Sequence, residues 1–245
     1  MKVRSIARLS IAGLLLPAGA ALADSITLVA TRDNTLYESA TGALSNGAGQ
    51  YFFAGRNAAG DRRRGLVAFD LSSVPSGATV TGVVLTLHLS QTLPYASPIA
   101  FELHRALAAW GEGTSNATSG GGGAGVASTP GDATWIHTFY PTSFWASPGG
   151  DFAPAASASQ GADAVGSYAW GSTPQLVADV QGWLADPSSN FGWVLLGDES
   201  TFPTSKRFDT RENLQPAFRP GLSIEFMRKV GVEPATWSRV LELYR

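Results

Sequence analysis

Two arginine-rich segments contain the side chains best suited to bind a negatively charged ligand. The first, which we call the arginine strip, consists of Arg56, Arg62, Arg63 and Arg64. The second, which we call the basic segment, consists of Lys206, Arg207 and Arg211. A guanidinium group forms paired hydrogen bonds with a carboxylate, so clustered arginines predict recognition of acidic groups such as those of uronate sugars.

Ion pairing within the protein is the alternative interpretation of the same cations. Asp61 and Asp70 flank the arginine strip, and Asp209 and Glu212 alternate with the basic segment. Pairs with these acids would hold the rim of the fold together and leave little positive charge for a ligand. The sequence leaves both interpretations open.

Aromatic side chains are a second possible contact for a sugar, because the apolar face of a sugar ring stacks on an exposed aromatic ring. Tyr51 precedes the arginine strip by a few residues and is our candidate for this contact. Further aromatic residues lie in or beside expected loops, namely Trp110, Trp135, Tyr140, Trp145 and Trp170. Most large aromatic side chains of a domain this size are buried, so few of them are expected to be platforms.

Catalytic chemistry has weaker support in the sequence. The three histidines, His88, His104 and His137, lie near no nucleophile motif such as GxSxG, and we expect them to be solvent-facing or hydrogen-bonded within the fold. A pair of acids could still hydrolyse a glycosidic bond. The candidates are Glu102, Glu112, Asp198, Glu199 and Glu212. We therefore predict no catalytic residues, and a polysaccharide lyase or hydrolase remains the enzymatic alternative.

The composition limits the cofactors. The chain has no cysteine, which rules out disulfides and cysteine-ligated metals. Loop carboxylates and carbonyls are suitable ligands for a structural Ca²⁺, although no EF-hand spacing identifies them. Ca²⁺ is thus the one cofactor that the sequence suggests, with unknown ligands.

The first 23 residues have the pattern of a cleavable secretory signal. A basic start precedes an apolar run over residues 9–16, and small residues lead to Ala23. Cleavage there would remove three of the 17 basic residues and leave 14 against 19 acidic ones, a formal net charge of −5. This balance argues against nucleic-acid binding. We expect a secreted protein, extracellular or at the cell surface with the periplasm as an alternative, and no transmembrane segment after the signal.

The elements that must position these residues are predicted to be mostly strands. Short β-rich segments recur between turn residues, over residues 25–30, 50–55, 65–71, 80–90, 99–107, 133–139, 191–196 and 221–226. Leu85, Leu87 and Leu89 alternate with polar residues, which indicates a strand with one buried face. The spacing favours an all-β sandwich or jelly roll. The glycine-rich segment 111–125 is expected to be a mobile or ligand-shaping loop.

Two segments have the spacing of helices. Apolar residues over 173–184 recur at helical intervals behind Pro174, which predicts one short amphipathic helix with Trp183 in the core. The C-terminal tail, residues 228–245, contains a second helical pattern from Glu233 onward. This tail could dock on the domain or on components of a cell envelope or extracellular matrix.

An ordered series of motifs resembles a known family. The series runs through DNTLYE at 33–38, SNG at 45–47, RRGLVAFDL at 63–71, VPSGA at 74–78, NFGW at 190–193 and KRFDTRE at 206–212. Together these motifs resemble the secreted DNRLRE domain, which is related to disaggregatase-type repeats and to carbohydrate-binding module family 96. The resemblance covers about residues 25–226, and Thr35 and Tyr37 stand where the name motif has arginines.

The resemblance implies a jelly-roll β-sandwich that binds acidic polysaccharide, such as alginate, through basic residues on one face. The arginine strip lies where the basic segment of such modules would fall. We therefore expect one domain over residues 24–227 that acts as a non-catalytic carbohydrate-binding module. The alternative is a structural or adhesive protein of the extracellular matrix or cell surface.

Overall fold

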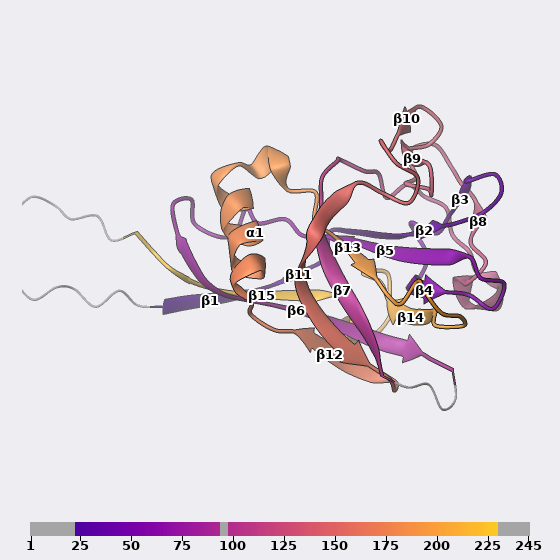
Figure 1. Ribbon diagram of the computed structural model, residues 1–245. Helices are drawn as coiled ribbons and strands as arrows, with labels where there is room; N and C mark the ends of the chain where they lie inside the picture. Colours follow the sequence, from indigo (N-terminus) through magenta and orange to yellow (C-terminus); the bar gives the residue numbers. More distant parts are fainter. Residues whose placement is uncertain (1–22, 94–97, 230–245) are drawn as a thin grey trace, which may run out of the picture.

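The protein is mostly β in the computed structural model, which describes residues 23–93 and 98–229. Within these residues, eleven strands join in one antiparallel sheet in the order β1-β15-β6-β14-β4-β5-β13-β7-β11, with β12 beside β6 and β2 beside β5 (Figure 1). The predicted all-β class is confirmed. The predicted secretory signal, apart from Ala23, and the helical pattern of the tail lie outside the described residues.

The bounds of the elements follow the chain order. The strands of the large sheet are β1 (Ala23–Val29), β2 (Arg32–Tyr37), β4 (Tyr51–Arg56), β5 (Arg62–Ala68), β6 (Thr79–Gln91), β7 (Ile99–Ala106), β11 (Phe152–Ala162), β12 (Gly166–Trp170), β13 (Trp193–Leu196), β14 (Lys206–Asp209) and β15 (Gly221–Met227). Two small two-stranded sheets pair β3 (Leu44–Ser45) with β8 (Val126–Ala127) and β9 (His137–Phe139) with β10 (Ser143–Phe144). The helices within the described residues are α1 (Pro174–Ala185) and three short 3₁₀ segments, η1 (Ser119–Gly122), η2 (Pro187–Ser189) and η3 (Pro216–Phe218).

The large sheet curls on itself around the main core. Strands β4 and β5 pair only through Gly55 with Arg63 and Arg56 with Arg62, so this joint divides the sheet into two halves. Across the core, the ring of Phe101 on β7 lies edge-on to that of Phe208 on β14, with centroids 5.3 Å apart. The apolar alternation of β6 faces the same core, where its leucines are fully buried.

A second, smaller core lies on the other face of β5. Leu66 packs there with Trp110, Trp135 and Trp145, all of which are buried. Trp170 is also fully buried, in the main core. These tryptophans, expected in or beside loops, are therefore part of the packing and offer no exposed ring for a sugar.

The predicted short helix is confirmed as α1. Thr173 caps it, since its side-chain oxygen accepts a hydrogen bond from the N–H of Leu176 at 3.0 Å. Val180 and Trp183 are buried against the sheet. The helix also buries Asp179, whose carboxylate accepts hydrogen bonds from Ser157 Oγ and from Trp193 Nε1.

Several sequence-based boundaries differ from the structure. The strand expected over 133–139 is reduced to β9, because Thr134 instead bonds the backbone N–H groups of Ile136 and His137 in a tight turn. The strands β2, β11, β12 and β14 were not predicted. In the described ranges 23–93 and 98–229, no helix has the length and apolar character that crossing a membrane requires.

Candidate functional site

The alternation of β5 separates the side chains of the arginine strip. Arg62 and Arg64 lie on one face of the strand, and both guanidinium groups stack on the ring of Trp135 at 4.9 and 5.0 Å from its centroid. Arg63 projects to the opposite face, where it stacks on Tyr37 at 5.0 Å. The strip is therefore not one continuous surface.

On the Trp135 face, each guanidinium group forms paired hydrogen bonds with a carboxylate. Arg62 donates to both oxygens of Glu38, at 3.0 and 2.6 Å, and the pKa of Glu38 is lowered to about 2, chiefly by this hydrogen bonding. Arg64 is buried and donates to both oxygens of Glu199 at 2.7 and 2.8 Å. Paired bonds of this kind are the ones that an acidic ligand would otherwise accept.

The other two arginines of the strip bond mainly to the backbone. Arg63 is buried, donates to the carbonyl oxygens of Glu38 and Arg62, and has Asp61 at 3.8 Å. Arg56 donates to the carbonyl oxygens of Gly60 and Glu199 and lies over the ring of Phe202. The arginines of the strip thus mainly form bonds within the protein, as the ion-pairing interpretation of the sequence expected. The carboxylates that pair with Arg62 and Arg64 are Glu38 and Glu199, which were not the acids expected.

The side chains of the basic segment are also separated, because successive residues of β14 lie on opposite faces of the sheet. Lys206 pairs with Ala54 and faces the core side, where it is 2% exposed and its ammonium donates to Thr92 Oγ1 at 2.6 Å. Arg207 pairs with Phe53 and faces outward. Arg211, beyond the strand, donates to both oxygens of Glu112 at 2.8 and 2.5 Å.

Arg207 and Tyr51 form one stacked unit on the outer face of β4 and β14. The guanidinium carbon lies 3.8 Å from the centroid of the Tyr51 ring, and Nε donates to Ser90 Oγ at 3.1 Å. Among the residues that the structure describes, no carboxylate lies within ion-pairing distance of Arg207. The two sequence-predicted residues are brought together, and the cation of this unit is left without a counter-ion there.

The glycine-rich segment folds over this unit. Asn46 Oδ1 accepts a hydrogen bond from the N–H of Ala117 at 2.6 Å, and the hydroxyl of Tyr37 donates to the carbonyl of Gly122 at 2.8 Å. Gly121 packs so closely that an added Cβ would lie 2.7 Å from an Arg207 Nη atom. Its φ of +66° also favours glycine. The positive φ accounts for glycine at this position, because the Arg207 side chain could move away from an added Cβ.

Each member of the stacked unit lines a separate cavity of about 220 Å³. Tyr51, Asn116 and Gly121 line one of them, and Arg207 and Gly120 line the other. We call this pair of cavities the Arg207 groove. Enclosed small-molecule sites are typically ~300–1,000 Å³, so the groove is better suited to successive units of a chain than to an enclosed ligand.

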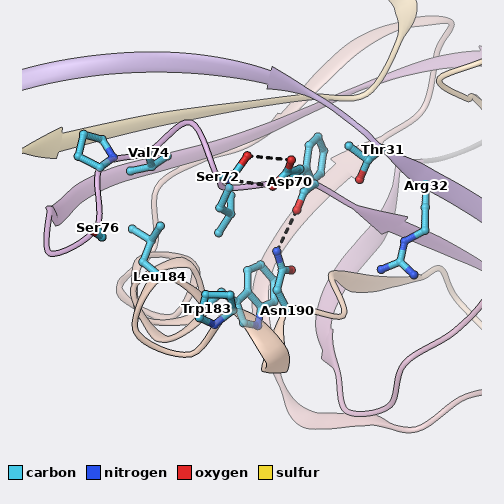
Figure 2. Close-up of a pocket in the computed structure, with 13 residues that line it drawn as sticks. Thr31, Arg32, Asp70, Ser72, Val74, Ser76, Trp183, Leu184 and Asn190 are labelled. Atoms are coloured by element: carbon cyan, nitrogen blue, oxygen red, sulfur yellow. Dashed lines mark hydrogen bonds between the residues drawn. The ribbon is translucent and has the colours of Figure 1, made fainter.

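The largest of the cavities described among these residues, about 520 Å³, lies between the end of β5, the turn that follows it and α1 (Figure 2). Its wall combines the apolar Phe69 and Leu184 with the polar Asp70. Asn190 donates from Nδ2 to the carbonyl of Phe69 at 2.9 Å, whereas its buried Oδ1 has no partner among the described residues. This cavity contains neither segment of predicted site residues, although residues of the motifs at 63–71, 74–78 and 190–193 line it.

The residues considered for catalysis are largely engaged in the fold. His88 bonds Asp209, His104 bonds the carbonyl of Ala153, and His137 bonds Thr134. The prediction that the histidines are hydrogen-bonded in the fold is confirmed. Of the acids considered, Glu112 and Glu212 come close together, joined by Asp33, which the sequence did not single out.

Comparison with known proteins adds no relative to this description. A scan against protein-family models finds no match to the chain, and a search of curated proteins likewise finds none.

Proposed function

We propose that this is a secreted, non-catalytic carbohydrate-binding module that holds an acidic, alginate-like polysaccharide in the Arg207 groove. The proposal includes a jelly-roll form of the β-fold and membership of the DNRLRE family, related to carbohydrate-binding module family 96. The ordered motifs of the sequence support that membership. The site is narrower than the one expected from sequence, because it rests on Tyr51 and Arg207.

The observation that carries the proposal is the state of Arg207. Its charge has no carboxylate partner among the described residues, in contrast to Arg62, Arg64 and Arg211. Stacking on Tyr51 and bonding to Ser90 orient the guanidinium before any ligand arrives. A preoriented arginine loses less conformational entropy on binding a carboxylate than a free side chain does.

The surroundings of Arg207 suit a sugar chain. Gln50, Asn116 and Thr118 line the groove beside Tyr51, and their amide and hydroxyl groups both donate and accept hydrogen bonds, as sugar hydroxyls require. The groove is open at the surface. Strands β4 and β14, which carry Tyr51 and Arg207, lie at the opposite end of the described fold from the start of β1 (Figure 1). A polymer can therefore run across the groove without having to enter the core.

The test is affinity electrophoresis of the chain from Asp24 onward against alginate, pectin, neutral glucans and a sugar-free gel. Alginate is expected to retard the wild type, less so at higher salt, because the contact is an ion pair. Arg207→Ala should weaken the retardation about tenfold or more, while Arg228→Ala, which removes an exposed arginine elsewhere, should not change it.

Three results would contradict the proposal in different ways. Equal retardation of the wild type and Arg207→Ala would show that the sugar binds elsewhere. Asp70→Asn would then test the largest cavity. No retardation by any glycan would favour a structural or adhesive role, for which the tail from residue 228 is the docking candidate. Release of unsaturated products or reducing ends from alginate would instead indicate a lyase or hydrolase.

A further inference from the structure

Three carboxylates from distant parts of the chain meet beside the second core. Asp33 comes from β2, Glu112 from the segment after β7, and Glu212 from the turn after β14. Each contributes an oxygen atom such that all three atoms lie within 4.8 Å of one another. Like charges at this separation repel, so a positive charge or a bound proton is needed to hold them together.

Two buried oxygens of this cluster have no hydrogen-bond partner among the described residues. Asp33 is fully buried, and its Oδ2 accepts from the N–H of Arg211 at 2.8 Å while its Oδ1 has no partner. Glu212 Oε2 is likewise buried without one. A buried acceptor left unpaired costs about 1–3 kcal/mol, and more if it is charged, so such atoms point to a bound ion or water.

The arginine at the cluster supplies too little charge to balance it. Arg211 donates to both oxygens of Glu112 and lies 2.9 Å from Glu212, but one guanidinium offsets only one of three carboxylates. Arg32, whose Nη1 donates to the carbonyl of Trp110 at 2.7 Å, also lies close enough to Glu112 to interact with its charge, so two guanidinium groups face three carboxylates.

We propose that Asp33, Glu112 and Glu212 bind one Ca²⁺ ion, which ties β2 to the two segments that carry the glutamates. The ligand set is all oxygen and anionic, the kind that hard cations take, with water completing the six to eight ligands of Ca²⁺. No histidine belongs to the cluster, and the chain has no cysteine, so softer transition metals have no preferred ligand.

The site anchors the start of the glycine-rich segment. Glu112 Oε1 accepts from the N–H of Asp33 at 2.9 Å, and the Glu112 carbonyl accepts from Asn34 Nδ2 at 3.0 Å. An ion here therefore fixes residue 112 on β2, a few residues before the stretch that covers the Arg207 groove. Ca²⁺ binding at this site does not depend on whether the protein binds a sugar.

The test uses the chain from Asp24 onward, stripped with EDTA, and Ca²⁺ alone as the probe. Isothermal titration should show one Ca²⁺ bound per chain with a Kd below about 1 mM, as in other extracellular calcium modules. Ca²⁺ should also raise the thermal midpoint. Glu212→Gln, at a partly exposed residue, should lower the affinity at least tenfold, and Asp33→Asn should do the same.

Glu102→Gln serves as the matched control, because Glu102 is half-exposed, bonds only His104 and lies outside the cluster. It should bind Ca²⁺ as the wild type does. Circular dichroism of each variant establishes that it folds. Wild-type protein that takes up no Ca²⁺, or a folded Glu212→Gln variant that binds it unchanged, would overturn the proposal. If the wild type binds no Ca²⁺ and Asp33→Asn is more stable than the wild type, a proton on Asp33 relieves the repulsion among the three carboxylates instead of a metal ion.

Discussion

Arg207 stacks on Tyr51 with its guanidinium carbon 3.8 Å from the ring centroid, the shortest such separation among the described residues. Register explains the contact. Strand β14 pairs with β4 so that Arg207 is opposite Phe53 and Asp209 is opposite Tyr51. Arg207 and Tyr51 are therefore diagonal neighbours on one face of the sheet, within reach of a long side chain.

The ring of Tyr51 should matter to binding more than its hydroxyl does. Tyr51→Phe keeps the stack and is expected to bind uronate oligosaccharides as the wild type does. Tyr51→Leu removes it, and since an exposed cation–π contact is worth about 0.5–1 kcal/mol, the affinity should fall roughly two- to fivefold. Isothermal titration measures both; equal affinity for all three proteins would show that the stack does not orient Arg207.

The buried pair of Arg64 and Glu199 should be essential to stability. Arg64→Ala leaves the Glu199 carboxylate, which is 19% exposed, without its paired donor and with only the more distant Arg62, at 3.9 Å, as an ion-pairing partner among the described residues. Breaking a buried pair from one side typically costs about 3–5 kcal/mol. Urea denaturation should show a loss of this size, against less than about 0.5 kcal/mol for Arg228→Ala at the exposed surface. A loss below about 1 kcal/mol would mean that the pair contributes little.

Glu38 should make stability depend on pH in the acid range. Its pKa in the folded protein is about 2, below the ordinary 4.5, so its pairing with Arg62 stabilises the fold above about pH 4.5. That contribution is lost as the pH falls from 4.5 towards 2. Because Glu38 is partly exposed, the expected contribution at pH 7 is only ~1–2 kcal/mol.

Glu38→Gln is the variant that tests this assignment. Unfolding free energies of wild type and variant, measured from pH 7 to pH 3, should differ most at neutral pH and converge on acidification. Curves that stay parallel through that range would assign the acid sensitivity to another carboxylate.

Replacing Lys206 with methionine should preserve or increase stability. The ammonium is buried on the core side of β14, and desolvation lowers its pKa, so the charged form is disfavoured by folding. Methionine has a similar length and carries no charge. The thermal midpoint of Lys206→Met should equal or exceed that of the wild type, and a marked decrease would show that the bond to Thr92 outweighs the burial of the charge.

The strands that follow a simple apolar pattern could be predicted, and the polar ones could not. Strand β6 shows its buried leucines by alternation. Strand β2 instead buries Asp33, Asn34 and Thr35, and the first two are residue types that single-sequence patterns assign to turns. Asn34 is buried there because its side chain bonds Ser45, Asn46 N–H and the Glu112 carbonyl, partners that only the tertiary fold brings together.

The candidate sites were predictable as residue types but not as pairings. The sequence identified Arg64 and Arg207 as arginines suited to a carboxylate, but Glu199 is 135 residues from Arg64 in the chain. The sequence does not show that the two residues are close in space, so it cannot distinguish a buried structural arginine from a free one. Asp33 was missed for the same reason, since the glutamates that join it come from segments after β7 and β14.

The pairing of β1 with β15 has a mechanical consequence. Ala23 is the register partner of Met227, so the two strands bring both ends of the described domain to one point (Figure 1). Tension applied between those ends would peel β1 away one hydrogen-bonded pair at a time, because the ladder bonds lie across the strands. The first strand would therefore yield to a small force, whereas a load between the Arg207 groove and either end would pull on the whole sheet at once.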